Sequence, residues 1–323
     1  MEKTQKTTSS GQEVRPFANL MMDTAFKISF GKESGGQNMI YLLEKLLPGK
    51  HITEIEYTDK EHPGLFLSEK KSIFDLECKA GDESFVVEMQ VQKKSSFQDR
   101  VLYYSTFLLR EQLMTPLEEI QALTTEKKKE IADYKLRPVY LVSIVNFKLK
   151  HQSAEALDEG LISRYSIRNE NADENMTEAL HFVFLELGRM TYGPKEDYKC
   201  KNPLERLAFL FKNGEELTHL PESFEKDKEI LELLKSMEIM KYTDEQRRRY
   251  EAEIFATLEK NSELKAARDD GIEEGFERGV EKGVKQGIEQ GVRTVAQNLK
   301  ASDIPPETIA RVTGLTLEQI EAL

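Results

Sequence analysis

The sequence contains little cysteine, no tryptophan and no long apolar run. Among its 323 residues there are two cysteines, Cys78 and Cys200. Two cysteines without metal-ligand spacing give no disulfide framework, and they suit a reducing compartment, so we expect a cytoplasmic protein. No run approaches the ~18 apolar residues that a membrane span requires. The N-terminal residues also lack the apolar core of a signal peptide. We therefore expect no membrane association, and a disordered tail over residues 1–18.

Several familiar catalytic patterns are also missing. The five histidines show no ligand spacing, no glycine-rich phosphate loop follows an expected strand, and no Ser-His-Asp arrangement is indicated. The net charge is −12, from 58 acidic and 46 basic side chains. This balance argues against non-specific coating of nucleic acid or of an anionic membrane, but it leaves room for a local basic groove.

Residues 19–200 alternate between helical and strand patterns. Two short helices around a glycine joint are expected in residues 19–47, and an amphipathic helix in residues 96–113. Strands are expected at residues 51–61, 137–149 and 179–187, with a hairpin at residues 72–92. The run 137–149 is apolar and β-branched throughout, as in a strand buried on both faces. The order predicts a mixed α/β domain whose sheet is covered by helices.

Beyond residue 200 the pattern becomes helical. Residues 201–268 carry apolar side chains at helical spacing, and Thr243 with Gln246 forms a predicted capping box. Residues 294–323 read as two short helices in a helix-turn-helix-like element. The last helix offers no lysine or arginine for phosphate contacts, so a protein-interaction or oligomerisation role is favoured over DNA reading.

Residues 269–293 form an internal repeat in which glycine recurs at every fourth position and an apolar residue follows each one. Six interior glycines cost about 5–6 kcal/mol relative to alanine in a helix, so an isolated helix would be marginal. Two interpretations stay open. The segment is either a flexible charged linker or a helix that packs closely in a homo-oligomer, where glycine permits backbone approach.

The hairpin places carboxylates on one face. Folding it with a four-residue loop at residues 80–83 pairs Glu77 with Val86 and Asp75 with Glu88. The opposite face is apolar, which fixes the register. Like charges opposed across two strands are destabilising. Either the acids lie on a solvated outer face, or they bind a hard divalent cation that prefers oxygen ligands.

The stretch "FDLECKAGDESFVVEMQ" resembles the PD-(D/E)XK nuclease core, in which an Asp on one strand is followed by Glu-x-Lys on the next. The chain as a whole resembles the recombination-promoting nuclease / putative transposase family, which has Glu-x-Gln at the second motif. "MMDTAFKISFG", "DRVLYYSTFLLREQL", "RPVYLVSIVNF", "HFVFLELGRM" and the glycine repeat resemble further parts of that family in the right order. The resemblance implies a restriction-endonuclease-like mixed sheet flanked by helices, followed by an all-helical C-terminal region.

The resemblance also implies a site. Asp75 and Glu88 would bind Mg²⁺ or Mn²⁺, with the main-chain carbonyl of Met89 as a third oxygen. Gln90 stands where the wider fold has lysine, so it can orient a water molecule but cannot neutralise charge. Asp23 would add a carboxylate from the first helix, a role that Glu44 could also fill.

Three further side chains lie where DNA phosphates could approach in the family. They are Lys27, Arg100 and Tyr104, which could equally be helix-surface cations and a core tyrosine. The function implied is a metal-dependent DNA endonuclease that hydrolyses phosphodiester bonds, with DNA as its partner. The alternative is a weak or inactive nuclease-fold protein that binds DNA or another protein.

Overall fold

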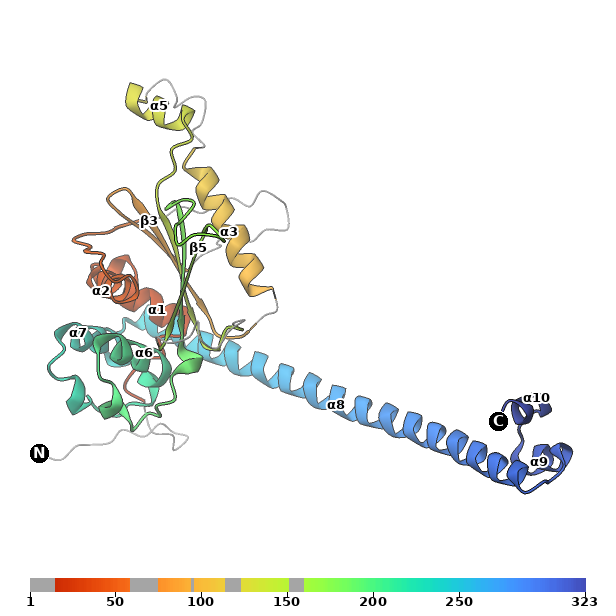
Figure 1. The fold of residues 1–323 in the computed structure, drawn as a ribbon. Coiled ribbons are helices and arrows are strands. Elements are labelled where there is room, and N and C mark those ends of the chain that lie inside the picture. The colour runs from red at the N-terminus through yellow and green to blue at the C-terminus, as the bar shows by residue number, and fades with distance from the viewer. Residues whose placement is uncertain (1–14, 59–74, 94–95, 114–122, 151–159) are drawn as a thin grey trace, which may run out of the picture. The chain divides into compact units, whose positions relative to one another are not determined.

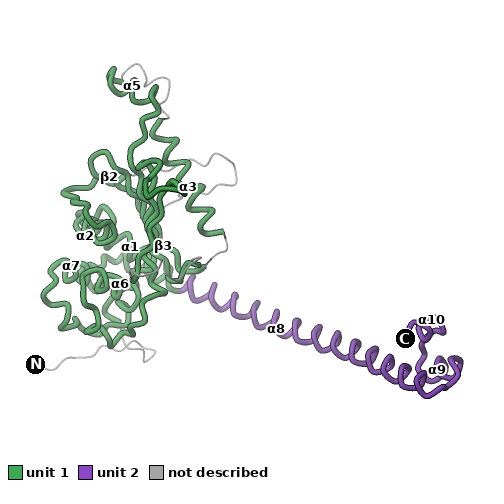
Figure 2. The backbone as a smooth tube through the Cα atoms, viewed as in Figure 1, with its two compact units in different colours: residues 1–254 green, residues 255–323 purple. Residues whose placement is uncertain are grey.

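The computed structural model describes residues 15–58, 75–93, 96–113, 123–150 and 160–323. The chain divides into two compact units, residues 1–254 and 255–323 (Figure 2). The predicted boundaries at residues 200, 268 and 293 stay predictions. Among the described helices, none is both long and apolar enough to cross a membrane.

The first unit is built around a mixed six-stranded sheet (Figure 1). Its strand order is β1-β2-β3-β4-β6-β5, with β3, β4 and β6 parallel and the other neighbours antiparallel. The strands are β1 (Glu56–Tyr57), β2 (Leu76–Ala80), β3 (Glu83–Gln90), β4 (Val139–Val145), β5 (Ile162–Ser166) and β6 (Leu180–Glu186). The mixed sheet flanked by helices confirms the fold class predicted from the sequence.

Helices cover both faces of the sheet. The helices of the first unit are α1 (Asp23–Phe30), α2 (Gln37–Leu46), α3 (Phe97–Glu111), α5 (Thr125–Ala132), α6 (Pro203–Asn213), α7 (Lys228–Met237) and the start of α8 (Asp244–Ala301). One face packs with α1, α2, α6 and α7 around Phe85, Val142 and Leu185. The other face packs with α3 around Val86 and Leu141. Every residue of β4 is buried because this central strand is covered on both sides, as its apolar run predicted.

The hairpin has the predicted register. Glu77 pairs with Val86 and Lys79 with Ser84, but Ala80 also pairs with Glu83. The predicted four-residue loop is therefore wrong, and the turn contains only two residues, Gly81 and Asp82. Gly81 has a positive φ of 56°, which glycine adopts without steric cost and which permits the tighter turn.

Residues 15–18, which were predicted to belong to a disordered tail, are ordered. Residues 1–14 lie outside the described residues, but Phe17 is buried and bridges to Glu238. The Ala18 amide donates to the Met237 carbonyl at 2.8 Å, and the Ile239 amide donates to the Pro16 carbonyl at 3.0 Å. Residues 15–18 are thus ordered by pairing with a segment more than two hundred positions away, which local composition does not reveal.

Two elements were not expected from the sequence. Edge strand β5 has polar residues in its middle, so it lacks a continuous apolar signal. Helix α5 is charged and has no buried residue. Strand β1 is also shorter than the predicted 51–61, of which residues 59–61 lie outside the described part of the chain.

The second unit contains most of α8 together with α9 (Pro306–Thr313) and α10 (Leu317–Glu321). Ala296, Ile309 and Ile320 form its small core. The Thr243 capping box is present at the start of α8, with reciprocal bonds to Gln246. The glycine repeat lies within α8, so residues 269–293 are helical in this structure.

Candidate active site

Asp75 and Glu88 meet where β2 begins and β3 approaches its end. Asp75 directly precedes the Leu76–Val87 pair, so it lies beside Glu88 across the two strands. Its Oδ2 accepts a hydrogen bond from the Met89 amide at 2.6 Å. The N–H and C=O of one residue in a strand point to the same side, so the Met89 carbonyl also points towards Asp75. The structure therefore places Asp75 and Glu88 beside the main chain of Met89.

Burial makes this pair of acids unusual. Loss of hydration raises the pKa of Glu88 to about 7; the Arg100 guanidinium opposes this rise, and the neighbouring Asp75 charge adds to it. Burial also raises the pKa of Asp75, against the bond from the Met89 amide. Two adjacent carboxyls with raised pKa values make this position a candidate functional site, where a bound cation would favour their ionised forms.

Arg100 reaches this site from the first turns of α3. Its Nη2 donates to Glu88 Oε1 at 2.7 Å and also to Gln90 Oε1. Gln90 Nε2 donates to the Gln92 carbonyl at 2.8 Å, which orients the amide. Arg100 was expected at a DNA phosphate, but here it is an internal partner of Glu88 and Gln90. Its position follows from the packing of α3 on the sheet, where Phe97 and Val101 are buried.

Asp23 lies at the first turn of α1, near enough to Asp75 for its charge to raise the Asp75 pKa. Lys27, one helical turn later, forms an ion pair with Asp23 at 2.8 Å and lowers the pKa of Asp75. Both residues therefore belong to the surroundings of the acid pair. The side chains of Asp23 and Lys27 are about half exposed, so they form the solvent side of the site.

Glu253 is a residue that the sequence analysis missed. Its two carboxylate oxygens accept hydrogen bonds from the Asp23 amide at 2.6 Å and the Thr24 amide at 2.9 Å. Met22, at the N-cap of α1, makes no side-chain cap bond. Glu253 thus takes the capping role and fixes the turn that carries Asp23. No sequence signal could have found it, because it is 230 positions away in α8.

Glu44 and Tyr104 lie in other surroundings. Glu44 Oε1 accepts from the Ile52 amide at 3.1 Å and lies 3.3 Å from His51 Nδ1. These contacts hold Glu44 at the end of α2. Of the two predicted acids, Asp23 is the one whose charge acts on Asp75. Tyr104 packs against the core on the α3 face, and the Arg100 guanidinium lies 6.0 Å from its ring.

The donor set fits a divalent cation. Among the described residues, no cluster of three or more His, Cys, Asp or Glu side chains could hold a metal by itself. One oxygen of each acid is fixed, Asp75 Oδ2 by Met89 and Glu88 Oε1 by Arg100. Within the described part of the chain, no hydrogen bond occupies Asp75 Oδ1 or Glu88 Oε2. Two oriented carboxylates and a carbonyl match the oxygen preference of Mg²⁺ and Mn²⁺, with water completing the shell.

Comparison with known proteins places the chain in a family. Searches of curated proteins and of solved structures found no match to the chain. The sequence profile of the family described as PD-(D/E)XK nuclease family transposase matches residues 20–267, which include Asp75, Glu88 and the whole sheet. The match agrees with the mixed sheet and confirms the family resemblance noted from the sequence. The chain belongs to the PD-(D/E)XK nuclease family transposases.

Proposed function

We propose that the protein is a divalent-metal-dependent DNA endonuclease. The observation that carries this proposal is the convergence of Asp75, Glu88 and the Met89 carbonyl beside Arg100 and Gln90, inside a nuclease-family domain. Desolvation and mutual repulsion oppose the ionisation of both acids, and a bound cation would relieve both effects.

Asp75, Glu88 and the Met89 carbonyl would hold the metal. When bound, Mg²⁺ or Mn²⁺ supplies Lewis-acid polarisation of a phosphate and lowers the pKa of a water. The chain itself orients the carboxylates, through the Met89 amide on Asp75 and the Arg100 guanidinium on Glu88. Asp23 adds negative charge on the solvent side, where a further cation or a water could be held.

Gln90 and Arg100 together replace the usual lysine. The Gln90 amide is neutral, but its carbonyl oxygen receives a bond from Arg100, so a positive charge is present at this position. The guanidinium stays charged at all working pH values. In our proposal, Gln90 orients the attacking water and Arg100 supplies the charge that favours its deprotonated form.

DNA is the proposed substrate, and Lys27 is the proposed phosphate contact. Its side chain is 47% exposed beside Asp75, and its pairing with Asp23 is an exposed interaction that a phosphate can replace. Tyr104 is assigned to packing on the α3 face, and Arg100 to the site itself.

A second candidate is a weakly active or inactive nuclease-fold protein that binds DNA or a protein. Gln90 favours it, because the neutral amide lacks the lysine charge and ties Arg100 to the acids. The two functions differ in one measurement, the nicking of supercoiled plasmid DNA.

The test is a plasmid-nicking assay with Mg²⁺ or Mn²⁺ on the wild type and on the variants Asp75→Asn and Asp75→Ala. We expect metal-dependent nicking by the wild type and loss of nicking in both variants. The variants should fold, and their metal-free melting temperature should equal or exceed that of the wild type, because one opposed acid has gone. Equal nicking by wild type and Asp75→Ala would place the active site elsewhere.

We also propose that the glycine repeat of α8 supports self-association. Ile272, Phe276, Val280, Val284 and Ile288 are each at least 49% exposed. A Cβ built on any of the six glycines meets no described atom of this chain within 4 Å. The glycines therefore have no packing role within one chain, whereas close approach by a second helix would give them one.

A further inference from the structure

A ladder of stacked rings crosses three strands on the face of the sheet opposite Glu88. Phe85 on β3 pairs with Tyr140 on β4, and Tyr140 pairs with His181 on β6. The ring centroids are 5.1 Å and 4.6 Å apart, with nearly parallel planes. Side chains alternate between faces along a strand, so Phe85 and Glu88 point to opposite faces. The ladder is therefore separate from the candidate active site.

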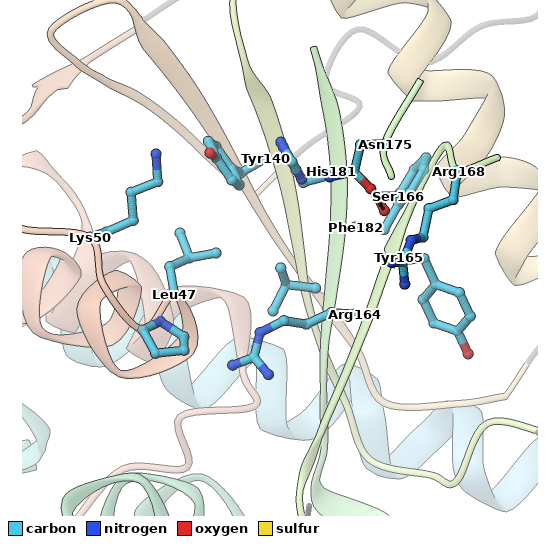
Figure 3. Close-up of a pocket in the computed structure, with 12 residues that line it drawn as sticks. Leu47, Lys50, Tyr140, Arg164, Tyr165, Ser166, Arg168, Asn175, His181 and Phe182 are labelled. Atoms are coloured by element: carbon cyan, nitrogen blue, oxygen red, sulfur yellow. Dashed lines mark hydrogen bonds between the residues drawn. The ribbon is translucent and has the colours of Figure 1, made fainter. Parts of the chain in front are cut away.

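The ladder stops one strand before the edge of the sheet. The next partner of His181 is Ser166 on edge strand β5, whose side chain is too small to stack. A cavity of about 480 Å³ lies here, with Tyr140, His181 and Ser166 among its lining residues (Figure 3). A planar ring seated beside His181 would take the fourth position of the ladder, above Ser166.

Two arginines flank that position. Arg164 and Arg168 are two residues on either side of Ser166 and also line the cavity. Arg164 Nη2 donates to the Leu46 carbonyl at 3.0 Å, which holds this guanidinium against the end of α2. Arg168 pairs with Asp173, and this pair is exposed, with 53% and 93% of the two side chains accessible. An exposed pair is weak, so an anionic ligand can compete for Arg168.

The remaining polar groups around this position have partners within the chain. Ser166 Oγ donates to Asn175 Oδ1 at 2.9 Å, and the Asn175 amide nitrogen donates to Glu178 Oε1 at 2.8 Å, so this amide is held at the rim of the cavity by its own chain. Lys50 is bound to Glu83 and Arg164 to the Leu46 carbonyl, so we assign the anion to Arg168, whose pair with Asp173 is exposed. Of the described residues that line the cavity, none is acidic, but the Glu178 carboxylate lies 3.4 Å from His181 Nε2 at its rim.

From this arrangement we propose a nucleotide-binding site at Ser166. The base stacks on His181 as the fourth ring of the ladder, and the phosphate binds Arg168, whose ion pair with Asp173 is exposed. Free nucleotides and the unpaired end of a DNA or RNA strand share this chemistry of an aromatic base joined to a phosphate. The proposal does not depend on nuclease activity, since it uses the other sheet face and requires no metal.

The test is calorimetric titration of the full-length protein in EDTA with dAMP, with inorganic phosphate and with a short single-stranded oligothymidylate. We expect dAMP or the oligonucleotide to bind at least about tenfold more tightly than phosphate, because stacking adds to the ionic contact. Equal affinity for dAMP and the strand identifies a free nucleotide as the ligand. A clear preference for the strand identifies an unpaired end.

Two variants make the test specific to this site. Ser166→Tyr fills the slot with its own ring, so binding should fall at least about tenfold while the melting temperature stays unchanged or rises, because a cross-strand ring pair is added. Arg168→Ala should weaken binding by about tenfold. Arg249→Ala is the matched control, since Arg249 forms an exposed ion pair on α8 outside the cavity. The proposal is overturned if the wild type binds none of the three probes at millimolar concentration, or if Ser166→Tyr binds as the wild type does.

Discussion

At the scale of single residues, the site consists of two acids whose ionisation is opposed by burial, together with the Arg100 guanidinium, which reaches them from α3. Glu88 is 12% exposed and touches Arg100, yet its pKa is still raised, because one partly exposed guanidinium does not replace the lost hydration. A second cation with a higher charge would therefore be favourable at this position. Its effect on the free energy of unfolding can be measured without a catalytic assay.

The pH dependence of stability should reveal Glu88. Its pKa rises from 4.5 to about 7 on folding, so the folded protein holds this proton more tightly than the unfolded chain. The stabilising contribution is complete below the unfolded pKa and is lost as pH increases through about 7. In EDTA, the wild type should therefore lose up to about 3 kcal/mol relative to Glu88→Gln between about pH 5 and pH 8.

The measurement is the free energy of unfolding by urea across that pH range. Added Mg²⁺ should stabilise the wild type more at pH 8 than at pH 5, since the metal competes with the proton, and it should have little effect on Glu88→Gln. Parallel pH profiles for the two proteins would show that folding does not raise the pKa of Glu88.

Arg100 and Gln90 should be energetically coupled. Arg100→Ala removes the guanidinium that donates a hydrogen bond to Gln90, so nicking should slow by at least about tenfold. Gln90→Lys should fold and nick at least as fast as the wild type. The double variant should regain most of the activity lost in Arg100→Ala, because lysine supplies the charge directly.

Arg110→Ala is the control for this cycle, as Arg110 is an exposed arginine on the same helix. Additive effects of the two substitutions would contradict the coupling. If Gln90→Lys unfolds, Gln90 is more deeply packed than the structure has it.

At the scale of elements, the position of α1 is decided by α8. Helix α1 starts without a capping side chain of its own, and the Glu253 carboxylate accepts its first two amides. The turn that carries Asp23 and Lys27 is thus tied to the beginning of a helix over two hundred residues away. In addition, residues 16–18, which precede α1, pair with residues 237–239, which precede α8.

Glu253→Ala should lower the free energy of unfolding by about 1 kcal/mol, as expected for the loss of a helix cap. Nicking should also slow, because Asp23 is no longer fixed beside Asp75. Glu251→Ala, an exposed position on the same helix, is the matched substitution and should change neither quantity. A Glu253→Ala protein as stable as Glu251→Ala would show that the cap contributes nothing in solution. Urea denaturation and the nicking assay give the two readouts.

At the scale of the whole molecule, the glycine repeat is helical, and among the described residues its contacts are pairs along its own helix, such as Arg278 with Glu274. Its apolar residues are exposed, and its six glycines oppose helix formation by about 5–6 kcal/mol relative to alanine. A second copy that packs on these glycines would bury the apolar residues and offset that cost.

Replacing Gly279, Gly283 and Gly287 with leucine should weaken self-association by blocking backbone approach. The matched alanine replacements should raise helicity and disturb association less. Sedimentation of both full-length variants, the wild type and a chain ending at Ala267 measures the effect. The truncated chain retains the entire first unit. If the wild type and the truncated chain are both monomers at tens of micromolar, the repeat is a linker to α9 and α10.

The sequence by itself determined the three central strands and the hairpin register, but not edge strand β5. The alternation of apolar and acidic residues around Gly81 allows only one register, because a shift by one residue would bury the acids and expose Phe85. The same local patterns placed α1, α3, the Thr243 cap and the two last helices, and they brought Asp75 beside Glu88.

Only the tertiary structure decided which side chains complete the site. Arg100 bonds Glu88 because α3 packs on the sheet, and Glu253 caps α1 because the start of α8 returns to it. The ring ladder and its gap at Ser166 need the order β3-β4-β6-β5, in which β6 lies between β4 and β5. Contacts of this kind join residues tens to hundreds of positions apart, and periodicity carries no information on such pairs since it reports only on neighbours within one element.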